Sequence, residues 1–199
     1  MSFQHRLRRF VILSVIGLVL GAGLAGIALL GKKPHLSSLT QGIGGDFSLI
    51  NQDGQPVTKK SFGGKYLLIY FGFTYCPAIC PTELQKMAEA YHALPKNWQD
   101  RIQPLFISVD PERDTPEVLK NYVALFLPEL VGLTGTPVQI DAIKRAYKIY
   151  AAKIPDGDSY TMDHSSYIYL MAPDGTAKAM FKTSDTAKDI ARHIAGLSQ

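Results

Sequence analysis

The sequence is poor in cysteine and, beyond its amino-terminal end, has no excess of positive charge. Its two cysteines are too few for a scaffold held together by several disulfides. After residue 39 the chain carries sixteen Lys and Arg against seventeen Asp and Glu, which is a formal charge of −1. The basic stripe that marks a nucleic-acid-binding protein is therefore missing, and we expect no nucleic-acid partner. The chain also lacks internal repeats and low-complexity tracts.

One long apolar run is present, at residues 10–30, with Ser14 as its only polar side chain. Twenty-one residues at a rise of about 1.5 Å each would cross the hydrocarbon core of a bilayer as a helix. Three arginines precede the run and two lysines follow it, so the positive-inside rule places the amino-terminal end in the cytoplasm. We expect residues 1–9 to be a cytoplasmic leader and residues 10–30 a retained anchor. A cleaved signal peptide is the alternative.

The rest of the chain divides into a polar tether at residues 31–45 and a domain at residues 46–199. Nine residues before the anchor are too few for an organelle transit peptide. We therefore favour a bacterial inner membrane, with the domain in the periplasm, over the mitochondrial inner membrane. Gly17 and Gly21 form a small-xxx-small pair, which leaves a homodimer through the anchor as an option.

Strand and helix patterns alternate along the domain. Apolar runs predict strands, and turn residues at Asp53–Gly54 and Pro173–Gly175 predict two hairpins. The predicted core strands are residues 66–71, 105–109 and 167–171, and residues 177–181 pair with the last of them. Alternation of this kind favours an α/β fold with a mainly parallel central sheet and helices on both faces.

Three helices have readable starts. Pro81 is expected to open the first, and Thr115 to cap the second ahead of a proline. Thr136 and Gln139 make a capping box for the third, whose apolar face is expected to extend inward as far as Tyr150. The last helix is expected at residues 186–197.

Cys76 and Cys80 follow the strand at residues 66–71 and lie four residues apart. At that spacing on one helical turn, both sulfurs face the same side. A helix amino terminus lowers the pKa of a thiol, because its unpaired amides favour the anion. Three interpretations remain open: a structural disulfide, a redox-active dithiol and a metal site that needs further ligands.

His164 is the histidine that stands out among five. The others fall in the leader, in the tether and on expected helix surfaces, whereas His164 directly precedes a core strand. If that strand is antiparallel to the strand before the cysteines, the imidazole lies at their edge of the sheet. Asp163 and Ser165 are candidates to orient the ring. Met162 is a further soft donor, although packing is the simpler explanation for it.

Three blocks in this region resemble the Sco/SenC family. They are FGFTYCPAICPTEL at residues 71–84, SVDPERDTP at residues 108–116 and DHS at residues 163–165. The blocks occur in order over almost the whole domain. Tyr75 stands where many relatives have histidine, and Ala78 where many have aspartate. In the middle block we expect Asp110, Glu112 and Arg113 to form a helix-capping and salt-bridge cluster.

The resemblance implies a thioredoxin-like copper protein that is anchored in the membrane and serves assembly of the CuA site of cytochrome c oxidase. The family's copper ligands fall on Cys76, Cys80 and His164, and they would hold one copper ion per chain, Cu(I) or also Cu(II). The implied partners are the CuA-bearing subunit of the oxidase and an upstream copper donor. Soft thiolates suit Cu(I).

The alternative function uses Cys76 and Cys80 as a redox pair without obligatory copper transfer. The chain would then be a thiol–disulfide reductase that prepares the thiols of the CuA site, or a redox sensor. A peroxidase of the same fold is a third option, and it would need a single activated cysteine.

Overall fold

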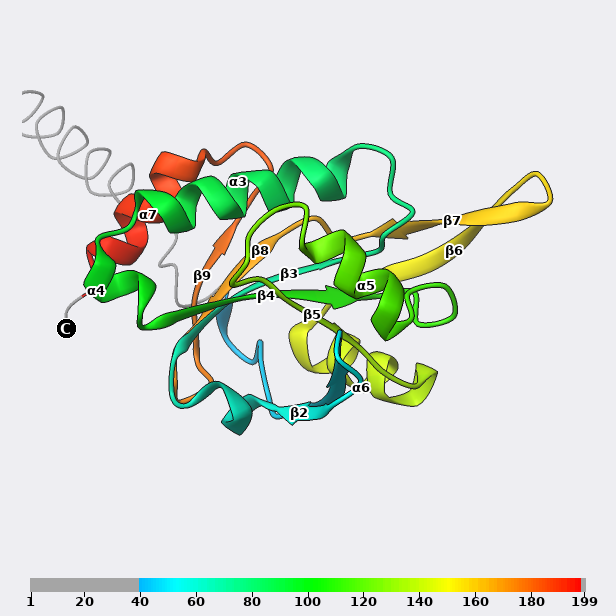
Figure 1. Ribbon diagram of the computed structural model, residues 1–199, viewed down its shortest axis with the longest axis horizontal. Helices are drawn as coiled ribbons and strands as arrows, with labels where there is room; N and C mark the ends of the chain where they lie inside the picture. The colour runs from blue at the N-terminus through cyan, green and yellow to red at the C-terminus, as the bar shows by residue number, and fades with distance from the viewer. Residues whose placement is uncertain (1–39, 198–199) are drawn as a thin grey trace, which may run out of the picture. The chain divides into compact units, whose positions relative to one another are not determined.

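The computed structural model describes residues 40–197 (Figure 1). The strands are β1 (Ser48–Asn51), β2 (Pro56–Thr58), β3 (Tyr66–Gly72), β4 (Ile102–Ser108), β5 (Val131–Thr134), β6 (Ala151–Asp156), β7 (Ser159–His164), β8 (Ile168–Met171) and β9 (Ala177–Phe181). The helices are η1 (Lys59–Phe62), α3 (Ile79–Ala93), α4 (Lys96–Gln99), α5 (Pro116–Val123), α6 (Pro137–Tyr147) and α7 (Ala187–Ala195). All four expected core strands and both expected hairpins are present.

Seven strands form one mixed sheet in the order β2-β1-β5-β4-β3-β8-β9. Only β3, β4 and β5 are parallel to one another, and the four remaining pairings are antiparallel. The expectation of a mainly parallel sheet is therefore wrong. The reason lies in the connections: β1–β2 and β8–β9 are joined by short turns, which can link only antiparallel strands.

Helices cover both faces of this sheet, as expected. On one face Tyr70 of β3 stacks on Phe106 of β4, which in turn contacts Tyr122 of α5. On the other face Phe71 packs against Tyr147 of α6, with ring centroids 5.4 Å apart. Helix α3 lies beside α7 (Figure 1). Strand β3 is consequently buried on both faces, which explains its continuous apolar sequence.

The caps predicted for α5 and α6 are confirmed, and Thr186 caps α7, but two helix ends differ from expectation. The α3 helix begins at Ile79, so that Pro81 is its third residue rather than its first. Proline costs little there, since the first turn has no intrahelical partner for its N–H groups. The α6 helix ends at Tyr147, because Lys148 adopts a left-handed conformation. Tyr150 therefore lies beyond α6 and is 57% exposed, not turned inward.

Strands β6 and β7 form a separate two-stranded hairpin that extends beyond the main sheet (Figure 1). Its register pairs Ala151 with His164 at the base and Asp156 with Ser159 at the tip. The last four residues of β6 are exposed. The sequence indicated only a loop here, since side chains exposed on both faces leave no clear alternation of apolar and polar residues.

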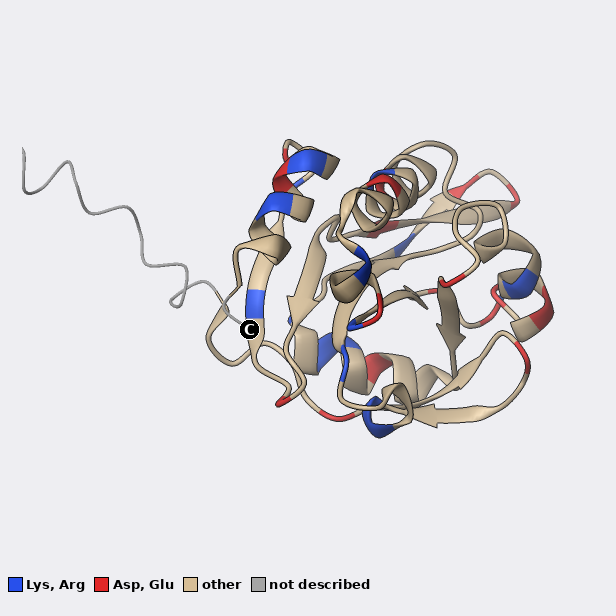
Figure 2. Ribbon diagram, turned by 60° about the vertical axis from the view of Figure 1, so that its left-hand side comes forward, with Lys and Arg blue, Asp and Glu red and all other residues tan. Residues whose placement is uncertain are grey.

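The predicted leader and anchor lie outside the described residues. Within residues 40–197, no helix is both long and apolar enough to span a bilayer. The part of the predicted tether that the structure describes contacts the domain: the Gly44 amide donates to the carbonyl of Ala146 at 2.9 Å, and Ile43 is buried. Basic and acidic residues are interspersed along the ribbon of the domain (Figure 2).

Candidate metal centre

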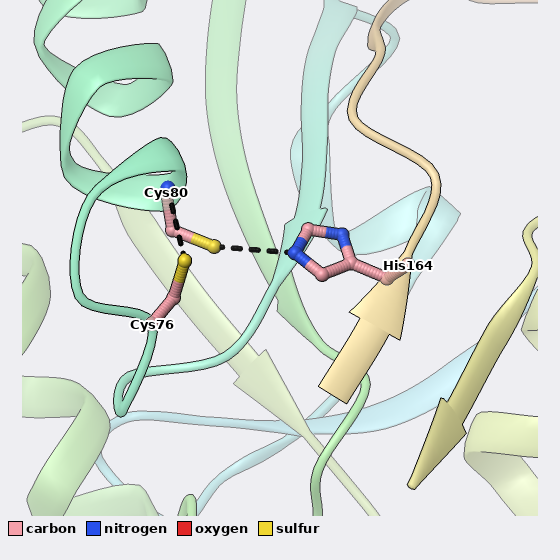
Figure 3. Close-up of side chains that lie close together, drawn as sticks. All are labelled: Cys76, Cys80 and His164. Atoms are coloured by element: carbon pink, nitrogen blue, oxygen red, sulfur yellow. Dashed lines mark hydrogen bonds between the residues drawn. The ribbon is translucent and has the colours of Figure 1, made fainter. Parts of the chain in front are cut away.

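The two cysteines lie between the end of β3 and the first turn of α3 (Figure 3). Cys76 belongs to the connecting loop, and Cys80 is the second residue of the helix. The Cys80 amide donates a hydrogen bond to Cys76 Sγ at 3.3 Å. Both cysteines are buried free thiols. The first turn of the helix therefore turns an unpaired amide toward a sulfur, as the sequence led us to expect.

Gly72 makes room for the Cys80 sulfur at the end of β3. A Cβ atom at this position would lie 2.7 Å from Cys80 Sγ and 3.0 Å from the rings of Tyr70 and Phe106. Such a contact is far shorter than van der Waals distance, so any side chain here would displace the sulfur. The glycine is thus part of the site, which its position in an apolar strand did not reveal.

His164 is the last residue of β7. It is distant from the cysteines in the sequence, but its side chain lies next to them in the fold. Strand β8, which follows, runs antiparallel to β3, so the residues before it lie at the edge where β3 ends. His164 Nε2 is 3.5 Å from Cys80 Sγ (Figure 3). The two sulfurs and a ring nitrogen all lie within 4.8 Å of one another. The structure thereby brings together the three residues picked from the sequence.

The imidazole is held in one tautomer by the backbone. His164 Nδ1 lies 3.0 Å from the carbonyl oxygen of Ser165. A carbonyl can only accept, so Nδ1 carries the proton and the lone pair of Nε2 points toward Cys80. Of the two residues expected to orient the ring, Ser165 does so through its backbone oxygen, whereas Asp163 is exposed. A ring oriented in this way is ready to act as a ligand.

The two thiols have pKa values shifted in opposite directions. The pKa of Cys76 is lowered to about 4, mainly because Cys80 donates a hydrogen bond to its sulfur. The pKa of Cys80 is raised by that same hydrogen bond and by burial. Burial also raises the pKa of Tyr70, whose hydroxyl lies 3.8 Å from Cys80 Sγ. One thiolate and one thiol therefore coexist at neutral pH.

This donor set fits a soft metal ion. Two sulfurs and an imidazole are the ligands that Cu(I) prefers, and Zn²⁺ would accept them with a fourth group. A cavity of about 350 Å³ opens beside them and is lined by Cys76, His164, Met162 and Phe73, among others. Cys76 and His164 line this cavity, whereas Cys80 has no exposed surface. Met162 is therefore beside the site as well as packed, being 9% exposed.

The other histidines of the described residues lie elsewhere. His92 is exposed on α3, as expected. His193 of α7 is half-buried rather than fully solvated, and its ring packs on Phe181 with centroids 5.5 Å apart. Burial lowers the pKa of His193. Neither ring belongs to the group formed by the two cysteines and His164.

The middle sequence block supports the cysteine loop through a buried carboxylate. Asp114 accepts hydrogen bonds from the amide and hydroxyl of Thr74, at 3.1 and 2.6 Å, and from the hydroxyl of Ser108. Burial raises its pKa. The expected cluster of Asp110, Glu112 and Arg113 is present only in part: Arg113 pairs with Asp110, whereas Glu112 pairs with Lys153 and Thr115 caps α5. The role of Asp114 could not be read from the sequence, because Thr74 is forty residues away.

A dithiol at the end of a central strand, with an imidazole brought to it by an antiparallel neighbour, defines a thioredoxin-like protein with a soft-metal site. The chain belongs to the SCO1/SenC family, whose model matches residues 37–199. It is 43% identical over 175 residues to the mitochondrial SCO1 homolog of Mus musculus, a match that covers 84% of this chain and 62% of that protein. It is 39% identical to a SCO2-like protein of Rickettsia felis, over 98% of this chain and 100% of the relative. The chain thus spans about three-fifths of the length of the mouse relative.

Solved structures show the same fold. Arabidopsis thaliana ScoI with copper bound has a TM-score of 0.73 and 42% identity, over 77% of this chain and 96% of that one. Bradyrhizobium japonicum ScoI with copper bound has a TM-score of 0.71 and 46% identity, over 76% and 97%. BsSco, described as having a disulfide switch and as a member of the Sco family of cytochrome c oxidase assembly proteins, has a TM-score of 0.61 and 27% identity, over 80% and 97%.

Proposed function

We propose that this chain is a copper-binding assembly factor that delivers copper to the CuA site of cytochrome c oxidase or prepares the thiols of that site. The observation that carries the proposal is the convergence of Cys76, Cys80 and His164 within 4.8 Å. The copper named for two structures of the same family supports the choice of metal. One copper ion per chain, Cu(I) and also Cu(II), is the expected cargo.

Each ligand has its own part in receiving the ion. Cys76 offers a thiolate at neutral pH because its pKa is about 4. Cys80 gives up its proton when the metal replaces the hydrogen bond between the two sulfurs, since the metal ligand is the thiolate. His164 binds through Nε2 without proton loss, because its proton is on Nδ1. Copper uptake therefore releases about one proton per chain near neutral pH.

The proposed partners are the CuA-bearing subunit of cytochrome c oxidase and an upstream copper donor. Three protein ligands leave room on the ion for an incoming ligand of a partner, which direct transfer requires. We also propose that residues 10–30 anchor the chain in a bacterial inner membrane, with the domain in the periplasm. The apolar run and its flanking charges support this placement, and so does the full-length match to a Rickettsia felis protein. A homodimer through the anchor stays a prediction.

Anaerobic titration of the reduced full chain with Cu(I), in competition with a chelator, tests the proposal. We expect one tightly bound ion in the unmodified chain, loss of tight binding on Cys80→Ser and weaker binding on His164→Ala. His92→Ala is the matched control, because it removes an exposed imidazole from the same domain, and it should leave the affinity unchanged. If neither Cys80→Ser nor His164→Ala changed the affinity for Cu(I), copper would not bind at this site.

A second function is favoured by the unequal pKa values of the two thiols. The Cys76 thiolate can attack a partner disulfide and form a mixed disulfide. Deprotonated Cys80 then attacks the Cys76 sulfur, which releases the partner as a dithiol and leaves Cys76 and Cys80 joined. Two electrons have then passed to the partner. The disulfide switch named for BsSco supports such redox activity, as either reductase or redox sensor.

Reduction of an oxidised CuA domain by the metal-free chain distinguishes this function from copper delivery. We expect stoichiometric reduction that disappears on Cys76→Ser and persists on His164→Ala, since the imidazole is no part of the electron transfer. A chain that binds copper through His164 but leaves the partner disulfide intact would be a copper carrier without reductase activity.

A further inference from the structure

The Arg113 guanidinium contacts three segments that meet around the candidate metal centre. We propose that Arg113 is a positioning residue, which holds the strand that carries His164 against the loop that carries Cys76. The proposal rests on the proposed copper-binding function and adds to it a residue that is not itself a ligand.

The first contact fixes the guanidinium to the end of the main sheet. Arg113 Nε donates to Asp110 Oδ2, and the side chain of Asp110 is completely buried. The Asp110 amide in turn donates to the hydroxyl of Ser108, the last residue of β4, at 3.0 Å. The guanidinium is therefore paired with a buried carboxylate whose residue is hydrogen-bonded to the end of β4, and not with an exposed side chain.

The second contact reaches the hairpin. Arg113 Nη1 donates to the carbonyl of Tyr160 at 2.8 Å, and the guanidinium carbon lies 3.8 Å from the centre of the Tyr160 ring. The Tyr160 hydroxyl donates to Asp110 Oδ1 at 2.8 Å. Tyr160 lies on β7, four residues before His164, so both side chains project from the same face of that strand. Three interactions thus hold β7 next to the main sheet.

The third contact reaches the cysteine loop. The guanidinium lies 4.7 Å from the ring of Tyr75, the residue before Cys76, and 5.9 Å from the ring of Phe73. Phe73 meets the His164 ring edge-on, with centroids 5.7 Å apart. One aromatic ring therefore separates the arginine from the imidazole.

These contacts exceed what a local salt bridge needs. An ion pair that only stabilised the loop before α5 would require Asp110 and nothing more. The remaining contacts of Arg113 all go to the two segments that bear ligands. A planar guanidinium can donate along its edge and stack on both of its faces at once, which a lysine cannot do. Loss of the Arg113 side chain should therefore leave His164 less well fixed in position relative to the cysteines.

A metal-free measurement tests this directly. The Phe73 and His164 rings, with centroids 5.7 Å apart, should give nuclear Overhauser contacts in the unmodified chain, and the full chain with Arg113→Met should lose them. Arg101→Met is the matched control, because Arg101 stacks on Trp98 at 4.5 Å and on Tyr66 at 5.9 Å, at the opposite end of β3. Ring contacts that survive Arg113→Met would overturn the proposal.

A Cu(I) competition assay on the full chain supplies the second readout. Arg113→Met should weaken Cu(I) binding about tenfold or more, as loss of residues behind a ligand commonly does. In the His164→Ala background the same substitution should have no further effect, since no imidazole remains to be placed. Arg113→Lys should fall between Arg113→Met and the unmodified chain. Equal losses in both backgrounds would show a merely structural role and overturn the proposal.

The two measurements distinguish failure of the positioning role of Arg113 from failure of the copper-binding function on which it rests. If the unmodified chain bound no Cu(I), the proposed function would fail, while the ring contacts would still report whether Arg113 positions His164. If copper bound through His164 but Arg113→Met changed neither readout, only the positioning role would fail.

Discussion

The sulfur ligands and the imidazole come from two regions of the domain that are built in different ways. The cysteines follow β3, whose residues after Tyr66 are all buried, and Cys80 has no exposed surface. His164 ends a hairpin that is more exposed than β3, and it is held in place by contacts to Tyr160 near the tip and by aromatic rings around His164 at the base. Burial positions the sulfurs, whereas a few specific contacts position the imidazole. Substitutions in the two regions should therefore differ in kind, with stability lost in one and ligand geometry in the other.

The largest expected difference between the regions is in stability. Phe71→Ala removes a fully buried ring that packs on Tyr147 and Tyr169, and it should lower the free energy of unfolding by about 3–5 kcal/mol. Ile154→Ala on the hairpin removes a side chain of a residue that is 42% exposed and should cost less than about 1 kcal/mol. Denaturant unfolding of the two variants measures both values. Similar losses would mean that the hairpin contributes to the core as much as β3 does.

The next largest effect is a difference in alkylation rate between the two cysteines, which lie in the same region. At pH 7 iodoacetamide should alkylate Cys76 at least about a hundredfold faster than Cys80, because only Cys76 is a thiolate and Cys80 is fully buried. Since the pKa of Cys76 is lowered to about 4, its rate should stay flat from pH 8 down to pH 5 and fall as the pH drops through 4.

Mass spectrometry of each cysteine-containing peptide measures these rates. In the chain unfolded by guanidinium the difference should vanish, and both rates should rise toward pH 9. A folded chain in which both cysteines react equally would contradict the assignment of thiolate and thiol.

A smaller effect tests the close packing behind Cys80. Gly72→Ala places a methyl group 2.7 Å from Cys80 Sγ and should cost about 1–3 kcal/mol of stability through overpacking. The displaced sulfur should also weaken Cu(I) binding. Gly196→Ala is the control, as its added Cβ would meet only backbone oxygens of its own helix at 3.3 Å or more. Unfolding curves and Cu(I) competition measure the two quantities. Unchanged values for Gly72→Ala would show that the sulfur has free space.

The smallest effect is expected on the hairpin surface. Lys153 pairs with Glu112 across the gap between the hairpin and the loop before α5, but both side chains are about half exposed. Exposed ion pairs contribute little, so Lys153→Ala should leave the denaturation midpoint and the Cu(I) affinity unchanged. A measurable loss of affinity would show that this exposed ion pair also helps to position the hairpin.

The sequence pattern was enough to predict the buried strand β3 and the starts of α5, α6 and α7, which depend on residues close together in the chain. The apolar run of β3, the caps Thr115 and Thr136 and the start of the last helix near Thr186 were found where expected, because strand burial and capping depend on neighbours in sequence. The direction of strands was not predicted well, since pairing joins residues far apart in the chain. The short β5 strand, VGLT, and the exposed β6–β7 hairpin carry too little periodicity to be read as strands.

The candidate site divides in the same way. Cys76 and Cys80 could be placed together from the sequence alone, because four residues of helix bring two side chains to one face. The resemblance to a family suggested His164, while residue chemistry alone left its role open. Arg113 was expected only in a salt bridge, and its aromatic contacts emerged from the structure.

By itself the sequence determined an apolar strand that ends in a pair of thiols at the start of a helix, since these features follow from residues close together in the chain. Only the tertiary structure decided that His164, eighty-four residues after Cys80, completes the group. The antiparallel pairing of β8 with β3 brings the imidazole to that edge of the sheet. Such pairing depends on contacts across the whole core, which no local pattern encodes.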